Sequence, residues 1–133
     1  MKYYNNINSC RKGFKLDPDE LWFTYEKHGK QIYCRISEIF YLESQEKKIR
    51  IVKKSGEDTF YGNISRLAEK LEPQRFLLCH QSLLVNYRHI AEYHGDEIVL
   101  SNGETLPVSR RKKKFVMEQL QKWMTEYVER LTE

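Results

Sequence analysis

The sequence has few cysteines, and their number argues against a disulfide scaffold. Its 133 residues contain only Cys10, Cys34 and Cys79, none of which belongs to a CxxC pair. Because an odd number of cysteines cannot pair fully within one chain, reduced and buried thiols are the simplest expectation.

Long apolar runs are also missing. No stretch approaches the roughly 18 apolar residues of a membrane-spanning helix, so we expect neither an integral membrane protein nor a membrane partner. The first residues, Met1 to Asn8, lack the apolar centre of a signal peptide. The expected location is therefore the cytoplasm.

Glycine and proline are scarce, whereas apolar residues are plentiful. The chain has six glycines and three prolines, with 40% hydrophobic and 13% aromatic residues. This composition is too apolar for a disordered chain and predicts a packed core. The length favours a single domain, because most domains contain roughly 100–150 residues.

The sequence contains no recognisable motif for catalysis or metal binding. It has no glycine-rich phosphate loop, GxSxG or HExxH pattern. The four histidines (His28, His80, His89 and His94) lack the i, i+4 spacing of a helical metal site. Cys79 precedes His80, but neighbours in a strand point to opposite faces and do not easily form a nucleophile–base pair. We therefore predict no enzymatic activity, metal, cofactor or small-molecule substrate.

The net charge of +4 is unevenly distributed along the chain. Two arginines and three lysines, Arg110 to Lys114, carry +5, so the remainder sums to −1. Such a run at the start of a helix can bind phosphate through its cations and the free N–H groups of the first turn. A solvated stretch that only aids solubility is the competing interpretation.

Short segments rich in β-branched and aromatic residues alternate with polar breaks, which is typical of strands. We expect a turn at 55–58, and we interpret residues 80–86 as a connection. The predicted strands are 21–27, 31–36, 39–43, 49–53, 59–61, 76–79, 89–93, 97–100 and 105–108.

The last two of these strands form a predicted hairpin. Asn102-Gly103 between them supplies the positive φ angles of a tight turn. Pro107 cannot donate a backbone hydrogen bond, so its strand should lie at a sheet edge.

Two helices complete the prediction. Asn63 can cap a short helix that ends before Pro73. From Arg111 onward, apolar residues recur at spacings of three and four, which predicts a C-terminal helix. The expected fold class is therefore mainly β, with one short internal helix and one C-terminal helix.

One segment resembles the signature of the LytTR DNA-binding domain family. Phe76 is followed by His80-Gln81-Ser82, Val85-Asn86 and Ile90, which resembles the family's aromatic, His-x-Ser-x-x-Val-Asn and Ile pattern. Three further pieces follow the family's order: an early strand ending in Glu43, a strand-to-helix step at 60–67, and a hairpin closing on Ser109-Arg110. The resemblance covers residues 21–119.

The resemblance implies an elongated, multi-stranded β fold and a bacterial transcription regulator, often the output domain of a response regulator. The implied partner is double-stranded DNA. The family reads it with loops in successive major grooves, typically at paired direct repeats, where the chain could bind as a dimer.

The family's base-reading positions correspond here to Lys48, Gln81 and Arg110. These residue types fit the role, because Arg and Lys pair with guanine and Gln pairs with adenine. His80 and Asn86 are expected to brace loops. The expected phosphate contacts, which fix register without reading sequence, are Lys47, Ser82, Ser109, Arg111, Lys112 and Lys113.

We divide the chain into a leader or linker remnant (1–20), a LytTR-type DNA-binding domain (21–118) and a C-terminal helix extension (119–133). The sequence shows no receiver domain, so the chain is either part of a larger regulator or is controlled otherwise. The helix can cover the domain's own sheet or form a dimer seam. Its apolar stripe consists of Phe115, Val116, Leu120, Trp123, Met124, Tyr127, Val128 and Leu131.

Two other functions remain open at this point. The chain could be a protein-interaction module that modulates a DNA-binding partner through its C-terminal helix. It could also bind single-stranded RNA, with some of its nine tyrosines as stacking platforms.

Overall fold

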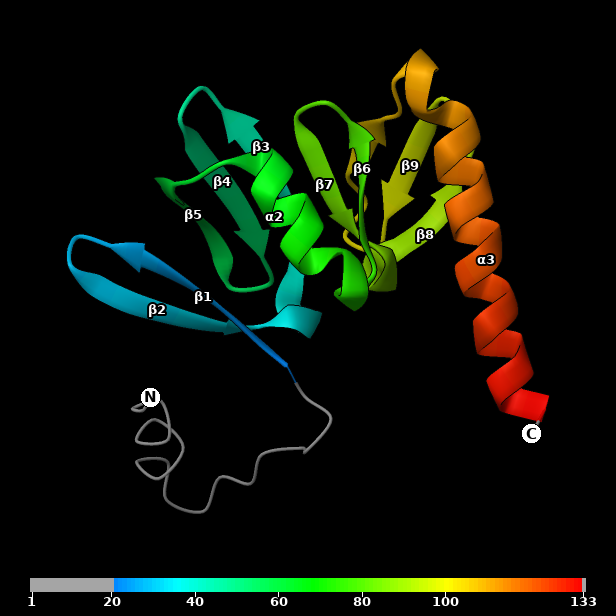
Figure 1. Ribbon diagram of the computed structural model, residues 1–133, viewed down its shortest axis with the longest axis horizontal. Helices are drawn as coiled ribbons and strands as arrows, with labels where there is room; N and C mark the ends of the chain where they lie inside the picture. The colour runs from blue at the N-terminus through cyan, green and yellow to red at the C-terminus, as the bar shows by residue number, and fades with distance from the viewer. Residues whose placement is uncertain (1–20, 133) are drawn as a thin grey trace.

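The computed structural model describes residues 21–132, with side chains to Glu126, so Cys10 and the 1–20 segment lie outside the described residues. The described part contains ten strands and two α-helices, which confirms the mainly β class with one internal and one C-terminal helix (Figure 1). In chain order they are β1 (Trp22–Lys27), β2 (Lys30–Arg35), β3 (Ile39–Gln45), β4 (Lys48–Lys53), β5 (Gly56–Tyr61), α2 (Ile64–Leu71), β6 (Phe76–His80), β7 (Leu83–Asn86), β8 (Ile90–Tyr93), β9 (Glu97–Leu100), β10 (Thr105–Pro107) and α3 (Lys113–Thr132).

The strands form three antiparallel sheets. The central sheet has the order β5-β4-β3-β7-β6, flanked by the β1–β2 hairpin and by a sheet of order β10-β9-β8. Pro107 therefore lies in an edge strand, as predicted. None of the helices in the described part is both long and apolar enough to cross a membrane.

The inner strand β7 of the central sheet was not predicted as a strand. All four of its residues, Leu83–Asn86, are buried between β3 and β6. A strand buried on both faces lacks the apolar–polar alternation that marks a half-exposed one, so periodicity could not identify it. The predicted turn at 55–58 is also wrong in its bounds, because β5 already begins at Gly56.

Helix α2 begins as its sequence predicts. The Asn63 side chain accepts a hydrogen bond from Arg66 N at 3.0 Å, and the helix ends at Leu71. Pro73 lies in the following 3-10 turn, which closes at Arg75 in the left-handed region (φ 65°). This turn returns the chain into β6.

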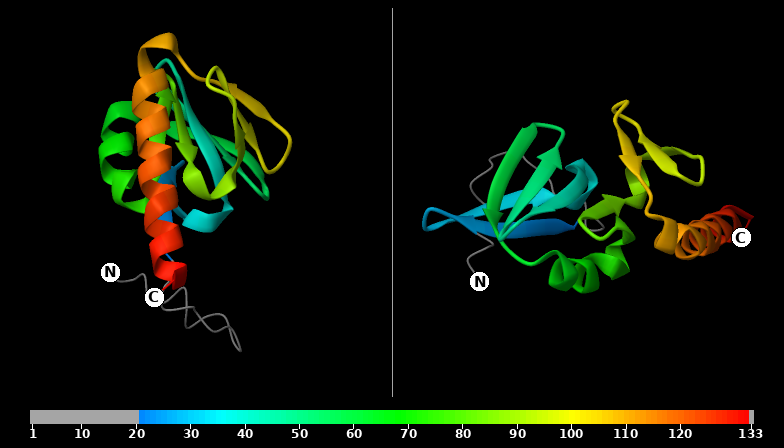
Figure 2. Two further views of the ribbon diagram at one scale, coloured as in Figure 1. Left: turned by 90° about the vertical axis from the view of Figure 1, so that its right-hand side faces the viewer. Right: turned by 90° about the horizontal axis from the view of Figure 1, so that it is seen from above.

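Other elements pack against both faces of the central sheet (Figure 2). Its buried side chains form two apolar cores, one on each face. Alternate residues of each strand supply them: Leu42 and Ile51 face the β1–β2 hairpin and α2, whereas Tyr41 and Val52 face the β8–β10 sheet and α3. Tyr41 also joins the two sheets, because its hydroxyl donates to Glu104 Oε2 at 2.9 Å.

Helix α3 packs against the second core through part of its apolar stripe. Val116 and Trp123 are buried, and Trp123 makes an edge contact with Tyr87 at a centroid distance of 5.3 Å. Met124 is 54% exposed and Phe115 is 47% exposed, so these two residues do not cover the sheet. The side chains of Tyr127, Val128 and Leu131 lie outside the described residues.

Candidate nucleic-acid interface

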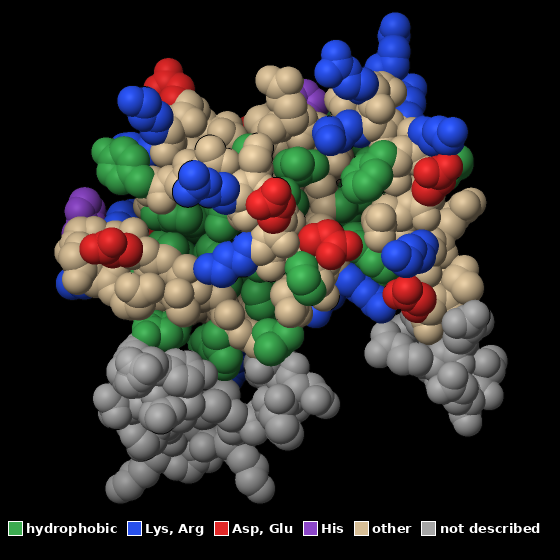
Figure 3. Space-filling model, viewed as in Figure 1, with side chains coloured by type: hydrophobic (Ala, Val, Ile, Leu, Met, Phe, Trp, Pro, Cys, Tyr) green, Lys and Arg blue, Asp and Glu red, His purple; other side chains and the backbone are tan. Residues whose placement is uncertain are grey.

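Three connections meet along one edge of the molecule, the upper edge in Figure 1. They are the β3–β4 turn, the β6–β7 turn and the segment from β10 to the start of α3. Nearly all the residues expected to contact DNA lie on these connections, although they are far apart in the sequence. Figure 3 shows Lys and Arg side chains gathered around the start of α3, whereas at the β3–β4 turn cationic and acidic side chains lie next to each other.

The β3–β4 turn forms the first group of side chains. Lys47 and Lys48 are exposed, and with Gln45, Glu46 and Tyr61 they line a shallow hollow. Lys48 Nζ lies 5.5 Å from the centroid of the Tyr61 ring, within the range of a cation–π contact. Glu46 has a φ of 62°, so the tight turn is formed by a residue in the left-handed region. The strands thus hold both lysines at the end of the sheet.

The β6–β7 turn and the start of α3 form the second group. Their side chains line one hollow, whose members include His80, Gln81, Ser109, Arg111 and Lys112. Gln81 is exposed at the tip of the turn. The structure therefore brings together predicted contact residues that are separated by about 30 positions in the sequence.

His80 accepts a hydrogen bond that holds the β6–β7 turn. The Ser82 backbone N–H donates to His80 Nδ1 at 3.3 Å, and Ser82 Oγ lies 3.2 Å from the same nitrogen. Because Nδ1 acts as an acceptor, the neutral ring carries its proton on Nε2. This hydrogen bond fixes the shape of the turn, and Gln81 lies at its tip.

A backbone contact joins the segment before α3 to β6. Ser109 N donates to Cys79 O at 2.9 Å, and the Cys79 thiol lies 3.5 Å from Pro107 O. Burial raises the pKa of this thiol to about 12, which makes it a poor nucleophile. Cys34 and Cys79 are free and buried, as predicted from the sequence.

The basic run lies at the positive end of a helix. Residues Arg110–Lys112 form a 3-10 turn that leads into α3, so the basic run spans the N-terminal end of that helix. The helix dipole disfavours positive charge there, at a few tenths of a kcal/mol for each exposed cation. An anion bound at this end relieves that repulsion.

Lys113 differs from its neighbours because it already has an anionic partner. Its Nζ forms an ion pair with the carboxylate of Asp96, in the β8–β9 connection. The hydrogen bond and charge of Lys113 lower the pKa of Asp96. A phosphate contact by Lys113 requires this pair to open.

Asn86 lies at the opposite end of β7 from the β6–β7 turn. It is fully buried, and its Nδ2 donates to Ile36 O at 3.1 Å and Ile39 O at 2.7 Å, while its Oδ1 accepts from Arg88 N at 3.1 Å. These bonds join the β2–β3 connection to the end of β7, away from the cationic edge.

Two aromatic residues of the edge were not identified as site residues from the sequence. Tyr61 and Phe115 are both exposed, and each has a lysine near its ring: Lys48 at 5.5 Å and Lys112 at 5.7 Å. The alternation of β5 could have indicated Tyr61, because a buried Phe60 places the next residue outward.

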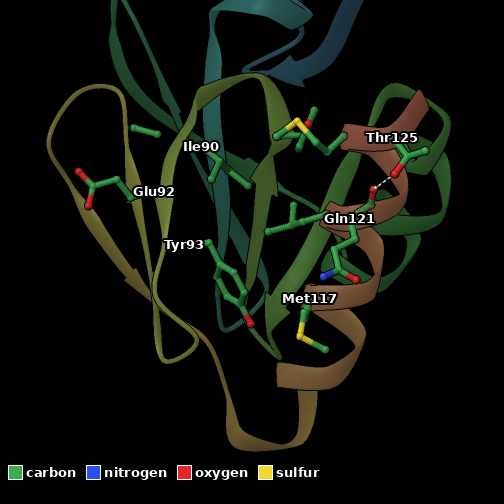
Figure 4. Close-up of a pocket in the computed structure, with 10 residues that line it drawn as sticks. Ile90, Glu92, Tyr93, Met117, Gln121 and Thr125 are labelled. Carbon is green, nitrogen blue, oxygen red and sulfur yellow. Dashed lines mark hydrogen bonds between the residues drawn. The ribbon is translucent and has the colours of Figure 1, made fainter. Parts of the chain in front are cut away.

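A further hollow lies between β8 and α3, and its lining is mostly apolar (Figure 4). Ile90 and Tyr93 form one wall, and Met117, Leu120 and Met124 form the other. Among the described residues that line it, Glu92 is the one with a charge, and none supplies the cations that a nucleic acid requires.

Comparison with known proteins identifies a matching family and several relatives of this chain. Residues 29–121 match the profile of the LytTr DNA-binding domain. Over 96 residues the chain is 28% identical to transcriptional regulatory protein BtsR of Escherichia coli K12 and of Salmonella typhimurium. The match covers 68% of this chain and 39% of each relative, so the chain spans about two fifths of their length. A solved LytTr DNA-binding domain from Bacillus cereus has a TM-score of 0.66 and 25% identity, covering 74% of this chain and 95% of that one.

Proposed function

Because the chain belongs to the LytTR DNA-binding domain family, we propose that it is a sequence-specific, double-stranded DNA-binding transcription regulator. Its turns enter successive major grooves at paired direct repeats, where a second copy binds beside the first. It acts by binding alone, without a catalytic reaction or a cofactor.

The observation that carries this proposal is the gathering of cations and polar side chains on one edge. Three connections from different parts of the sequence end at this edge, and each presents at least one exposed residue suited to a base edge or a phosphate. Turns held by strands can reach into a groove without a recognition helix, because the sheet fixes where their tips lie.

The proposed base contacts are Lys48, Gln81 and Arg110, all of which are exposed. The guanidinium of Arg110 can donate twice to guanine O6 and N7, and the amide of Gln81 can pair twice with adenine. Each such pair contributes roughly 1–3 kcal/mol of discrimination against a wrong base.

The proposed phosphate contacts fix the position of the chain on DNA. They surround the β3–β4 turn, the β6–β7 turn and the first turn of α3, so they clamp the backbone on either side of the base contacts. They are Lys47, Ser82, Ser109, Arg111, Lys112 and Lys113. Lys113 makes its contact after release from Asp96.

The proposal is tested by selection from a random duplex library, followed by fluorescence anisotropy at about 50 and 200 mM salt. Enrichment of paired direct repeats that still bind at the higher salt supports a sequence reader and supplies its operator. Binding that is lost at the higher salt, without enrichment of any sequence, contradicts it and reduces the edge to a general polyanion surface.

A second candidate function is a protein-interaction module that modulates a DNA-binding partner through α3. The apolar hollow between β8 and α3 favours it, because Met117 and Met124 are exposed there (Figure 4). Stable self-association in sedimentation equilibrium without measurable affinity for any duplex supports this candidate over the first.

A further inference from the structure

Tyr61 is an exposed aromatic residue in an unusual place. Its side chain is 77% exposed, the largest value among the exposed large apolar residues that the structure describes. It is the last residue of β5, and it lies beside Lys48, one of the proposed base contacts. Contact between such an exposed ring and an apolar surface is favourable, because it removes apolar area of the ring from water.

The backbone around Tyr61 fixes where its ring lies. Tyr61 is the cross-strand partner of Lys48, and the next residue, Gly62, donates its N–H to Lys47 O at 3.2 Å. Its neighbour Phe60 is buried in the core, so alternation along the strand directs Tyr61 away from that core. The backbone of Tyr61 is therefore held beside the β3–β4 turn by its pairing with β4 and by the Gly62–Lys47 hydrogen bond.

The side chains of Lys48 and Tyr61 place a cation and an aromatic ring next to each other in the same hollow. Lys48 Nζ lies 5.5 Å from the ring centroid, and both side chains line the hollow with Gln45 and Glu46. A lysine that reaches a base edge or a phosphate in the major groove brings this ring into the groove with it. The one apolar group on the major-groove edges of the four bases is the 5-methyl group of thymine.

We propose that Tyr61 is a further specificity-determining residue, whose ring packs against the 5-methyl group of a thymine in the groove entered by the β3–β4 turn. This inference rests on the proposed DNA-binding function. It differs from the base contacts above because it reads shape and apolar surface, with no hydrogen bond to the base.

The test replaces each thymine of the selected duplex, one at a time, by deoxyuridine, which lacks only the methyl group. The wild-type chain is expected to lose about fourfold in affinity at one or two thymines, the loss that corresponds to one buried methyl-sized group. Tyr61→Ala is expected to bind the thymine duplex more weakly and to show no further loss with deoxyuridine. Tyr61→Phe keeps the ring and should retain the wild-type response.

Leu21→Ala provides the matched control, because Leu21 is also an exposed apolar residue (44%) but lies away from the edge, where its carbonyl oxygen accepts from Ile36 N in the β2–β3 connection. It should leave both affinity and the deoxyuridine response unchanged. Circular dichroism melts of all variants establish that each is folded.

Three outcomes overturn the inference while leaving DNA binding intact. One is equal affinity of the wild-type chain for the thymine duplex and every deoxyuridine duplex. Another is a deoxyuridine response that persists in Tyr61→Ala. The third is an equal loss of affinity for thymine and deoxyuridine duplexes in Tyr61→Ala, which would assign the ring to the sugar–phosphate backbone. Failure of the proposed function is distinct, because the wild-type chain would then enrich no duplex.

Discussion

At the scale of single residues, exposure and partners separate side chains that look alike in the sequence. Arg110 to Lys114 form one basic run, yet Lys113 is paired with Asp96, Lys112 lies over Phe115, and Arg110 is exposed at the edge. The resemblance to a family could indicate the run and its first arginine. It could not indicate the partner of Lys113, because Asp96 lies in another connection and only the fold brings the two together.

Arg110→Ala and Lys112→Ala should have different effects on DNA binding. On the proposed roles, Arg110→Ala removes a bidentate base contact, so the free energy of binding to the selected duplex should weaken by roughly 1–3 kcal/mol while random duplexes are less affected. Lys112→Ala removes a proposed phosphate contact, so binding to all duplexes should weaken alike and the salt slope should fall by about one. Competition anisotropy between selected and random duplexes measures both. An equal loss for both duplexes in both variants contradicts this assignment of roles.

Asp96→Asn should strengthen binding to every duplex. The substitution removes a negative charge from the cationic edge and frees Lys113 for a phosphate, so the dependence of log affinity on log salt should steepen by about 0.9. Titrations at several salt concentrations measure this slope. The double variant with Lys113→Ala is the control, because it has no cation to release and should lose the added slope. Weaker binding by Asp96→Asn would show that the pair orders the edge instead.

At the scale of elements, the sequence predicts best those features that depend on neighbouring residues. The cap at Asn63, the hairpin of β9 and β10 and the edge position of Pro107 are confirmed, because a side-chain bond, a φ preference or a missing N–H decides each one locally. The predicted pair of positive φ angles at Asn102-Gly103 is only half right, because Gly103 has a positive φ (92°) and Asn102 does not. The β7 strand was missed because its identity depends on two neighbouring strands. The gathering of three connections at one edge likewise depends on sheet order, which no local pattern contains.

The stabilisation that the contact between the β1–β2 hairpin and β5 contributes to the fold should depend on pH. Burial favours a raised pKa for the Asp58 carboxyl, but hydrogen bonds from Lys27 and Tyr25 outweigh it and lower the pKa to about 2. An unfolded aspartate titrates near pH 3.9. Because the folded pKa is the lower one, the stabilisation is present above about pH 4 and is lost as the pH falls towards 2.

Asp58→Asn should therefore lower the free energy of unfolding by about 1 kcal/mol at pH 7, since the partly exposed pair is screened by solvent. Urea unfolding at pH 7 and near pH 2 measures the effect, and the variant and the wild type should converge at the lower pH. Glu69→Gln, which removes an exposed carboxylate on α2, controls for the loss of one negative charge. A difference that persists unchanged near pH 2 would contradict an electrostatic cause.

At the scale of the whole molecule, α3 is part of the fold and not a separate appendage. It runs without interruption from Lys113 to Thr132, and the expected domain boundary between 118 and 119 lies inside it. Trp123 is 4% exposed in the second core, and Glu126 forms a 2.7 Å ion pair with Arg75. The stripe thus combines residues that cover the sheet with residues that remain exposed.

Removal of residues 119–133 should destabilise the protein severely. The Trp123→Ala variant isolates the main cause, and it should lower the free energy of unfolding by roughly 3–5 kcal/mol, the usual loss for a buried tryptophan. Met124→Ala is the matched control from the same helix, and because its side chain is largely exposed it should change stability by less than about 0.5 kcal/mol. Chemical unfolding, monitored by circular dichroism, measures the free energy of unfolding of the truncated chain and of both variants. A truncated chain of unchanged stability would favour the dimer seam.

The attachment of the three edge connections to different pairs of elements has a consequence for evolution. Each turn tip is exposed, while the strands beneath it are buried and hydrogen-bonded, so a tip can be substituted without repacking either core. If the edge reads DNA as proposed, duplicated copies of such a gene could acquire new operators by exchanging one tip residue at a time. Each intermediate would keep the other contacts, so selection could proceed through regulators that still bind.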